Sequence, residues 1–240
     1  MRRLENKIAI VTGGTKGIGL ATVEKMVQEG AIVYACARHY KEFNNPNIIY
    51  HELDVTDTNS CKRLFEDIIN KYNRIDILVA NAGITRDSLT VKMTDDDFDS
   101  VINTNLKGIF NLVRYIGPFM EKQGYGSIVL ISSVVGEQGN IGQANYAASK
   151  AGLIGMAKTW AKEFSRKGAQ VRVNVIAPGY IKTDMLSTVP QELLNRFESQ
   201  TMLKRLGNPE EVANVVFFLS SNEASYITGS IVDVNGGIKL

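Results

Sequence analysis

Tyr146 and Lys150 are the residues of this sequence whose types and spacing suggest chemistry most directly. They lie four positions apart in a stretch with helical spacing, so both side chains are predicted to lie on one helix face. A free tyrosine keeps its proton at neutral pH, and a neighbouring cation favours the phenolate. The pair is therefore a candidate for proton transfer, with Tyr146 as the general acid or base.

Ser133 is a third candidate, because it ends the predicted strand at 127–133, whose centre at 128–131 is apolar. Catalytic groups collect at the carboxyl ends of strands in open α/β sheets. A serine hydroxyl at that position could donate a hydrogen bond to a carbonyl oxygen or to a developing alkoxide. The structural alternative is a serine that caps a loop.

A glycine-rich turn lies near the N-terminus, between a predicted strand at 8–12 and a predicted helix that ends at residue 29. Such glycines let the backbone approach a pyrophosphate, and the helix N-terminus supplies N–H groups and a partial positive charge. The alternative is a glycine turn without a ligand. The candidate cofactor-binding residues of this turn are Gly13, Thr15, Lys16, Gly17, Ile18 and Gly19.

The residues after the second predicted strand indicate which nicotinamide cofactor is used. Enzymes that prefer NAD place an acid there to bind the ribose hydroxyls, whereas this strand ends at Ala37 and is followed by Arg38. A guanidinium suits a 2′-phosphate, and Lys16 adds a second cation. The pattern therefore predicts NADP(H), with a solvated surface arginine as the alternative.

Strands and helices alternate along the whole chain, which predicts a parallel sheet covered on both faces. The predicted strands are residues 8–12, 32–37, 48–53, 77–80, 128–132, 171–177 and 230–234. The predicted helices are residues 17–29, 58–72, 95–122, 146–167, 191–200 and 209–220. We expect an α/β chain with a single Rossmann domain over residues 1–240, in which a doubly wound, seven-stranded parallel sheet carries helices on both faces. The longer connection at 181–205 is a candidate substrate lid.

Composition excludes several other classes of protein. The net charge of +2 and the interspersed acids and bases argue against a nucleic-acid partner. No apolar run reaches the ~18 residues that would suggest a membrane span, so no membrane partner is expected. Cys36 and Cys61 have no motif spacing, and the acidic run at 95–97 is interpreted as the first turn of a helix. No metal site is expected, and the expected location is the cytoplasm.

Together these features, with several further motifs, resemble the short-chain dehydrogenase/reductase family over nearly the whole chain. Within that family, residues 81–87 and 142–148 are similar to the 3-oxoacyl-thioester reductases, which act on acyl-carrier-protein or coenzyme A thioesters. The motifs that carry the resemblance are Thr12-Gly13-x3-Gly17-x-Gly19, Asn81-Ala82-Gly83, Asn105, Ser133, Tyr146-x3-Lys150 and Pro178-Gly179.

The resemblance implies a role for each of these residues. Ser133 would bind the substrate carbonyl oxygen and Tyr146 would donate the proton. Lys150 would lower the pKa of Tyr146 and bind the nicotinamide ribose, and Asn105 would hold a water molecule that links the lysine to solvent. Besides Tyr146 and Lys150, the residues that the resemblance implies for cofactor binding are Asp54, Val55, Asn81, Ala82, Gly83, Pro178, Gly179, Ile181 and Thr183.

The implied reaction is the NADPH-dependent reduction of a 3-oxoacyl thioester, while the acyl carrier stays open. Arg166 and Lys167 match part of a basic patch suited to an acidic acyl carrier protein beside the active-site mouth. Residues 123–127 lack arginines expected for that carrier, and residues 189–191 resemble acetoacetyl-CoA reductases. Another short-chain dehydrogenase acting on a sugar or steroid alcohol, and a nucleotide-sensing protein without catalysis, remain as alternatives.

We also expect a homotetramer, since relatives pair the two long helices across two-fold axes and many form tetramers. The predicted helix at 146–167 carries more apolar side chains than one sheet-facing stripe needs, and residues 234–240 are expected at a second axis. The apolar residues of that helix are Leu153, Ile154, Met156, Ala157, Trp160, Ala161 and Phe164.

Overall fold

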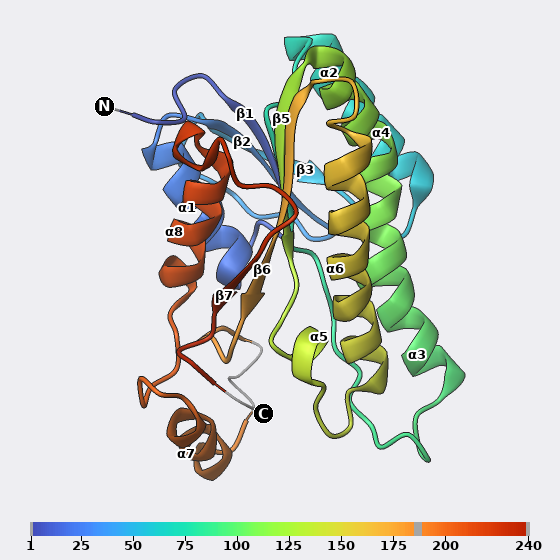
Figure 1. Cartoon of the computed structure of the whole chain (residues 1–240), viewed down its shortest axis with the longest axis vertical. Helices are drawn as coiled ribbons and strands as arrows, with labels where there is room; N and C mark the ends of the chain where they lie inside the picture. Colours follow the sequence, from blue (N-terminus) through green and yellow to red (C-terminus); the bar gives the residue numbers. More distant parts are fainter. Residues whose placement is uncertain (1, 185–188, 239–240) are drawn as a thin grey trace.

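The computed structural model describes residues 2–184 and 189–238, and its centre is one parallel sheet of seven strands. The strand order is β3-β2-β1-β4-β5-β6-β7, which confirms the predicted doubly wound fold (Figure 1). The strands are β1 (Ile8–Thr12), β2 (Ile32–Ala37), β3 (Ile48–Glu52), β4 (Ile77–Ala80), β5 (Tyr125–Ile131), β6 (Gln170–Pro178) and β7 (Ile231–Val234).

The central strands are apolar throughout because helices cover the sheet on both sides. Every residue of β1 and of β4 is buried. β5 begins at Tyr125, three positions before the predicted start at 128, because Tyr125 pairs with Gln170 at the beginning of β6. Such backbone pairing between distant segments leaves no periodic signal in the sequence of a strand end.

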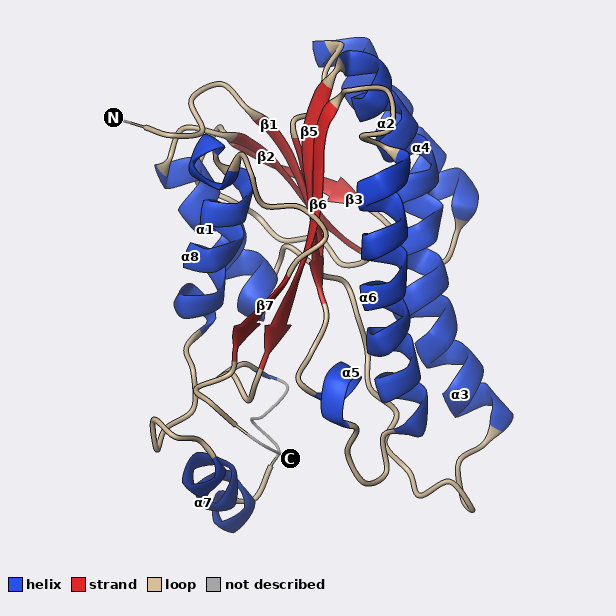
Figure 2. Cartoon of the chain, in the orientation of Figure 1, coloured by secondary structure: helices blue, strands red, loops and turns tan. Residues whose placement is uncertain are grey.

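Helices form a layer on each face, as Figures 1 and 2 show. One layer holds α1 and α8, whose apolar side chains pack against one face, and the other holds α2, α4 and α6. The helices are α1 (Gly17–Gln28), α2 (Thr58–Tyr72), α3 (Asp95–Ile102), α4 (Gly108–Gln123), α5 (Val135–Gln138), α6 (Ala144–Glu163), α7 (Gln191–Gln200) and α8 (Pro209–Ser220), with a 3₁₀ turn at Asn222–Ala224.

The predicted helix at 95–122 is interrupted. Its first part is α3, its second part is α4, and a π-helical segment at Asn103–Lys107 joins them. The acidic run at 95–97 lies in the first turn of α3, where the Thr94 hydroxyl accepts a hydrogen bond from the Asp97 amide at 3.1 Å. Carboxylates at a helix N-terminus interact favourably with the helix dipole, in agreement with the interpretation of that run.

The seven apolar side chains that the sequence predicts on the helix at 146–167 do not form a second, exposed stripe on α6. Five of the seven are buried in the core of this chain, and Ile154 and Met156 pack partly buried against the same core. The face of α6 that does stay exposed carries small residues, among them Ala148, Ala151 and Gly155. The prediction that α6 has surplus apolar side chains for a subunit contact is therefore wrong, because the core of this chain already covers them.

The connection after β6 is long, as the sequence predicts, and its described part carries α7. α7 has no buried residue, and Phe197 stacks on Tyr180 with ring centroids 3.8 Å apart. Ile181 forms a parallel bridge with Gly207, so both ends of the connection meet. The candidate lid at 181–205 includes residues 185–188, which lie outside the described residues, as do 239 and 240 of the expected C-terminal contact. No helix in the described ranges is long and apolar enough to span a membrane.

Candidate active site

The candidate residues meet at the carboxyl edge of the sheet. Because all strands are parallel, the ends of β1, β4, β5 and β6 lie along the same edge, and the segments that follow them carry most predicted site residues. The Thr12 hydroxyl at the end of β1 accepts hydrogen bonds from the amides of Asn81 and Ala82, both at 2.9 Å. The glycine-rich turn and the Asn81-Ala82-Gly83 segment are thereby held side by side.

α6 crosses this edge and presents Tyr146 and Lys150 one turn apart. The Lys150 ammonium is buried and donates a hydrogen bond to the Ile131 carbonyl oxygen at 2.7 Å. It lies 5.5 Å from the centroid of the Tyr146 ring. The Ser132 hydroxyl donates to the Lys150 carbonyl oxygen at 2.9 Å, so the end of β5 fixes this turn of α6.

Burial dominates the proton affinities of the pair. It raises the pKa of Tyr146 to about 12, although a hydrogen bond with Ser133 acts in the opposite direction and Asp87 adds a small increase. Burial lowers the pKa of Lys150 to about 8. Burial is thus the largest cause of both pKa shifts, while the Lys150 ammonium is held by Ile131, and the lowering of the Tyr146 pKa by Lys150 stays a prediction.

Ser133 joins this pair from the loop after β5. Its side chain is buried, and its hydroxyl accepts a hydrogen bond from the Val135 amide at 3.1 Å. The same hydroxyl forms the hydrogen bond with Tyr146 that moderates the tyrosine pKa. Ser133 thus bonds the backbone of its own loop, as the structural alternative predicted, and also lies beside the phenol.

Asn105 lies in the π-helical segment between α3 and α4 and is fully buried. Its carboxamide oxygen accepts from the Ile84 amide at 2.8 Å, and its nitrogen donates to the Ile84 carbonyl oxygen at 2.9 Å. The nitrogen also donates to the Ser149 hydroxyl at 3.2 Å. A methyl group on Gly83 would lie 3.3 Å from the Asn105 oxygen and 3.5 Å from the Lys150 nitrogen. The three residues are therefore neighbours.

Asn145 is a structural partner of the site that the sequence did not single out. It is fully buried at the start of α6, and its oxygen accepts from the Tyr146 amide at 2.7 Å. Its nitrogen donates to the carbonyl oxygens of Arg86 and Asp97, both at 3.0 Å. Nothing in the local sequence marks this role, because both carbonyl partners lie far from Asn145 in the chain.

Replacing Asn145 with alanine should destabilise the fold, because a fully buried carboxamide is lost and two part-buried carbonyl oxygens lose a donor. We expect the free energy of unfolding to fall by about 1–3 kcal/mol, the usual cost of a lost buried partner. Chemical denaturation monitored by circular dichroism measures this change. The matched control is Asn59→Ala on the exposed surface of α2, which should change stability by less than about 0.5 kcal/mol. Equal effects of the two variants would contradict this role.

The glycine-rich turn fits a dinucleotide phosphate. Gly13 has φ +65° and Gly17 has φ +53°, which glycine adopts without strain. A methyl group on Gly19 would overlap the carbonyl oxygen of Gly13, and one on Gly17 would lie 3.2 Å from the Thr183 methyl. Lys16, the N-cap of α1, makes no side-chain capping hydrogen bond. The first N–H groups of α1 thus face a narrow cradle that would bind an anion.

Arg38 and Asp54 follow β2 and β3, which lie three and four strands away in the sheet from β5, the strand that Ser133 follows. Arg38 is exposed, and neither it nor Lys16 forms an ion pair with any described carboxylate by contact distance. Asp54 accepts hydrogen bonds from Thr56, from its amide at 2.9 Å and its hydroxyl at 2.7 Å. Burial raises the pKa of Asp54, but the Thr56 bonds and the charge of Arg38 outweigh it and the net pKa is lowered.

The remaining candidate cofactor residues border the same edge. The Val55 carbonyl oxygen accepts from the buried Asn111 side chain at 3.0 Å, a contact that the sequence did not suggest. The Pro178 carbonyl oxygen accepts from the Val134 amide at 2.9 Å, next to Ser133. The Gly179 amide donates to the Val234 carbonyl oxygen at 3.1 Å. Ile181 is buried, whereas Thr183 is half-buried against Gly17.

Arg166 and Lys167 do not lie beside the active-site mouth of their own chain. They follow the C-terminal end of α6, and its 20 residues span about 30 Å from the end that carries Tyr146. Both pair with Glu121, with Nε of Arg166 at 3.6 Å and Nζ of Lys167 at 3.5 Å. The expectation of a basic patch next to the mouth is thus wrong within one chain.

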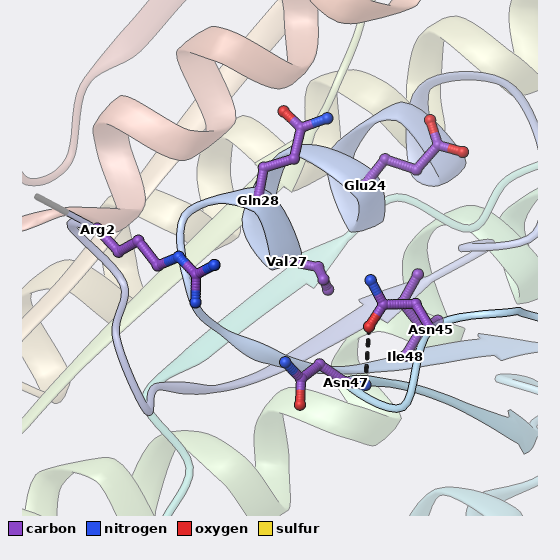
Figure 3. A pocket seen from close by; sticks show the side chains of 7 residues that line it. All are labelled: Arg2, Glu24, Val27, Gln28, Asn45, Asn47 and Ile48. Carbon is purple, nitrogen blue, oxygen red and sulfur yellow. Dashed lines mark hydrogen bonds between the residues drawn. The ribbon is translucent and has the colours of Figure 1, made fainter.

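A hollow of about 290 Å³ lies at the opposite, amino edge of the sheet (Figure 3). It lies between the end of α1 and the start of β3, far from Tyr146, so it is not the candidate active site. No group of three or more acidic, histidine or cysteine side chains able to hold a metal occurs in the described ranges. Residues lining the hollow are Arg2, Glu24, Val27, Gln28, Asn45, Asn47 and Ile48.

Comparison with known proteins agrees with this geometry. Residues 13–239 match the family model described as enoyl-(acyl carrier protein) reductase. The chain is 47% identical to the 3-oxoacyl-[acyl-carrier-protein] reductase FabG of Thermotoga maritima, over 99% of this chain and 100% of that protein. It is 44% identical to FabG of Aquifex aeolicus and 43% identical to FabG of Escherichia coli, each over 98% of both chains. With this site on this sheet, the chain belongs to the short-chain dehydrogenase/reductase family.

Proposed function

We propose that the protein reduces a 3-oxoacyl thioester to the 3-hydroxyacyl thioester with NADPH, as a 3-oxoacyl-[acyl-carrier-protein] reductase of fatty acid synthesis. The observation that carries the proposal is the meeting of Ser133, Tyr146 and Lys150 beside the glycine-rich cradle. The names of the relatives from Thermotoga maritima and Escherichia coli state the same reaction for those proteins.

The residues divide the chemistry of a carbonyl reduction among them. A bound nicotinamide cofactor supplies the hydride. Ser133 and Tyr146 have hydroxyls close enough to bond each other, so both can hydrogen-bond one substrate carbonyl oxygen. Tyr146, whose pKa is about 12, holds its proton at neutral pH and donates it to the oxygen as negative charge develops there. Lys150 binds the nicotinamide ribose and supplies positive charge beside the phenol.

Asn105 keeps a supporting role in the same proposal. Its carboxamide bonds Ile84 and Ser149, so it links the segment after β4 to the turn of α6 that lies between Tyr146 and Lys150. Its neighbour Gly83 leaves room for the cofactor against the Lys150 ammonium. In this proposal Asn105 also holds a water molecule through which the lysine exchanges protons with solvent.

NADPH rather than NADH is supported by charge at the adenosine end. Arg38 follows β2 where an NAD-preferring enzyme carries an acid, and Lys16 lies in the turn. Asp54 lies two residues after the end of β3 and accepts two hydrogen bonds from Thr56. In this proposal it binds the adenine amino group rather than a ribose hydroxyl. The connection at 181–205, whose α7 rests on Tyr180, is proposed as the lid over the substrate.

The carrier of the acyl group is tested by comparing substrates. We expect the protein to oxidise NADPH with acetoacetyl-[acyl-carrier-protein] and with acetoacetyl-CoA, with the higher kcat/KM for the carrier-protein thioester. Absorbance loss at the NADPH band measures both rates. Crotonyl-CoA, an enoyl thioester, is the control that separates carbonyl reduction from the enoyl reduction in the description of the family model. Turnover of crotonyl-CoA alone would overturn the proposed reaction, and no turnover of any thioester would favour another alcohol substrate or a sensor.

Assembly as a homotetramer is part of the proposal and has its own test. Phe110 on α4 is an exposed aromatic side chain that suits a contact along the long helices, and the C-terminal residues after β7 are proposed for the second two-fold contact. Light scattering at micromolar concentration should give four times the chain mass of 26.4 kDa. A mass near that of one chain would refute the assembly, and a dimer would leave one of the two contacts standing.

A further inference from the structure

Lys41 returns from the connection after β2 to the glycine-rich turn. Its ammonium donates a hydrogen bond to the carbonyl oxygen of Thr15 at 3.1 Å and lies 5.8 Å from the centroid of the Phe43 ring. Its side chain is half-buried, unlike that of its neighbour Glu42. The sequence analysis assigned Lys41 no role. Lys41 lies three positions after Arg38, and nothing in the local sequence predicts its contact with Thr15.

Three cations therefore surround one turn. Lys16 directly follows Thr15, Arg38 directly follows β2, and Lys41 is bonded to Thr15 itself. Among the described residues, none of the three forms an ion pair with a carboxylate. An ammonium has three N–H donors, and the Thr15 carbonyl oxygen uses one of those on Lys41. Two donors and one uncompensated charge remain for a ligand at the turn.

The acids nearby do not neutralise this cluster. Glu42 is exposed and pairs with none of the three cations. Asp54 is engaged by the Thr56 amide and hydroxyl, and Arg38 is the one cation of the three that contributes, after those two bonds, to lowering its pKa. A doubly charged phosphate beside the turn would therefore meet an excess of positive charge. Because the bond to Thr15 already fixes the Lys41 ammonium, less side-chain entropy is lost on binding.

We propose that Lys41 is a third cation of the 2′-phosphate subsite and a determinant of NADPH specificity, in addition to Lys16 and Arg38. The inference rests on the proposed preference for NADPH. The ammonium would keep its bond to Thr15 and donate a second hydrogen bond to a phosphate oxygen. Charge-assisted hydrogen bonds to phosphate are stronger than neutral ones, so the contribution should be selective for the phosphorylated ribose.

The test compares ligands with and without the 2′-phosphate, by calorimetry and without turnover. We expect Lys41→Met to weaken binding of 2′,5′-ADP and NADPH about tenfold, the effect of one charge-assisted hydrogen bond at a half-exposed site, with 5′-AMP and NADH within about twofold. Lys41→Arg should restore most of the affinity. The matched control is Lys122→Met at the end of α4, on the amino edge of the sheet, which should change neither ligand.

The outcomes separate the possible roles of Lys41. Equal weakening of 2′,5′-ADP and 5′-AMP would mean that Lys41 only holds the turn, and would overturn the inference. Unchanged binding of both ligands would overturn it as well. If the parent protein binds 5′-AMP as tightly as 2′,5′-ADP, that result contradicts the proposed NADPH preference itself, and with it the role of Lys41. The difference between parent and Lys41→Met should shrink with added salt, because salt screens an exposed charge pair.

Discussion

Replacing Tyr146 with phenylalanine should lower kcat by about 10²- to 10⁴-fold, the usual contribution of a positioned general acid. The substitution removes one hydroxyl and keeps the ring that packs against the cluster of Val134, Val135 and Ile238. Without the hydroxyl, the proton for the developing alkoxide has to come from water, and Ser133 loses its hydrogen-bond partner. Steady-state assays with acetoacetyl-CoA and NADPH measure the loss.

Cofactor binding provides the internal control for this variant. NADPH affinity should stay nearly intact, because the glycine-rich turn and Arg38 are unaffected. Tyr226→Phe removes the same hydroxyl from a fully exposed tyrosine and should leave kcat within about twofold, as surface substitutions usually do. A Tyr146→Phe enzyme that retains turnover within tenfold of the parent would remove Tyr146 from the proposed mechanism.

Replacing Arg38 with aspartate should shift cofactor preference from NADPH toward NADH by more than tenfold, or about 1.4 kcal/mol. The change removes a cation that suits the 2′-phosphate and introduces an acid that binds ribose hydroxyls and repels the phosphate. Arg38 is exposed, so the substitution should cost little stability. The ratio of kcat/KM for the two cofactors is the measurement.

A charge control is needed because the variant changes the net charge by two units. Arg2→Asp makes the same change at the amino edge of the sheet, beside the hollow in Figure 3, and should leave the ratio unchanged. Lys16 and Lys41 remain in Arg38→Asp, so some NADPH affinity should persist. A parent enzyme that already prefers NADH would contradict the interpretation of Arg38 and Lys16 together.

Several features of this protein follow from the sequence because their signals are local. Residues 8–12 and 77–80 are apolar and short, so they predict buried strands, and both have the predicted bounds in the structure. Gly13 and Gly17 adopt positive φ, which suits glycine because it has no side chain, and the sequence shows glycine at both positions. The spacing of Tyr146 and Lys150 places them on one helix face wherever that helix packs. The fold class needed no more than such local signals, whereas Asn105 and Asp54 became candidates only through the family resemblance.

Only the tertiary structure decided how those residues act on one another, because burial and long-range hydrogen bonds depend on elements that are distant in the sequence. It bonded Lys150 to Ile131 and packed Tyr146 partly buried against Val134 and Val135, so burial is the largest cause of the raised tyrosine pKa. It put Arg166 at the far end of α6 and covered the apolar residues of that helix with the core of the same chain. It also brought Lys41 back to Thr15, a contact whose two partners carry no shared pattern.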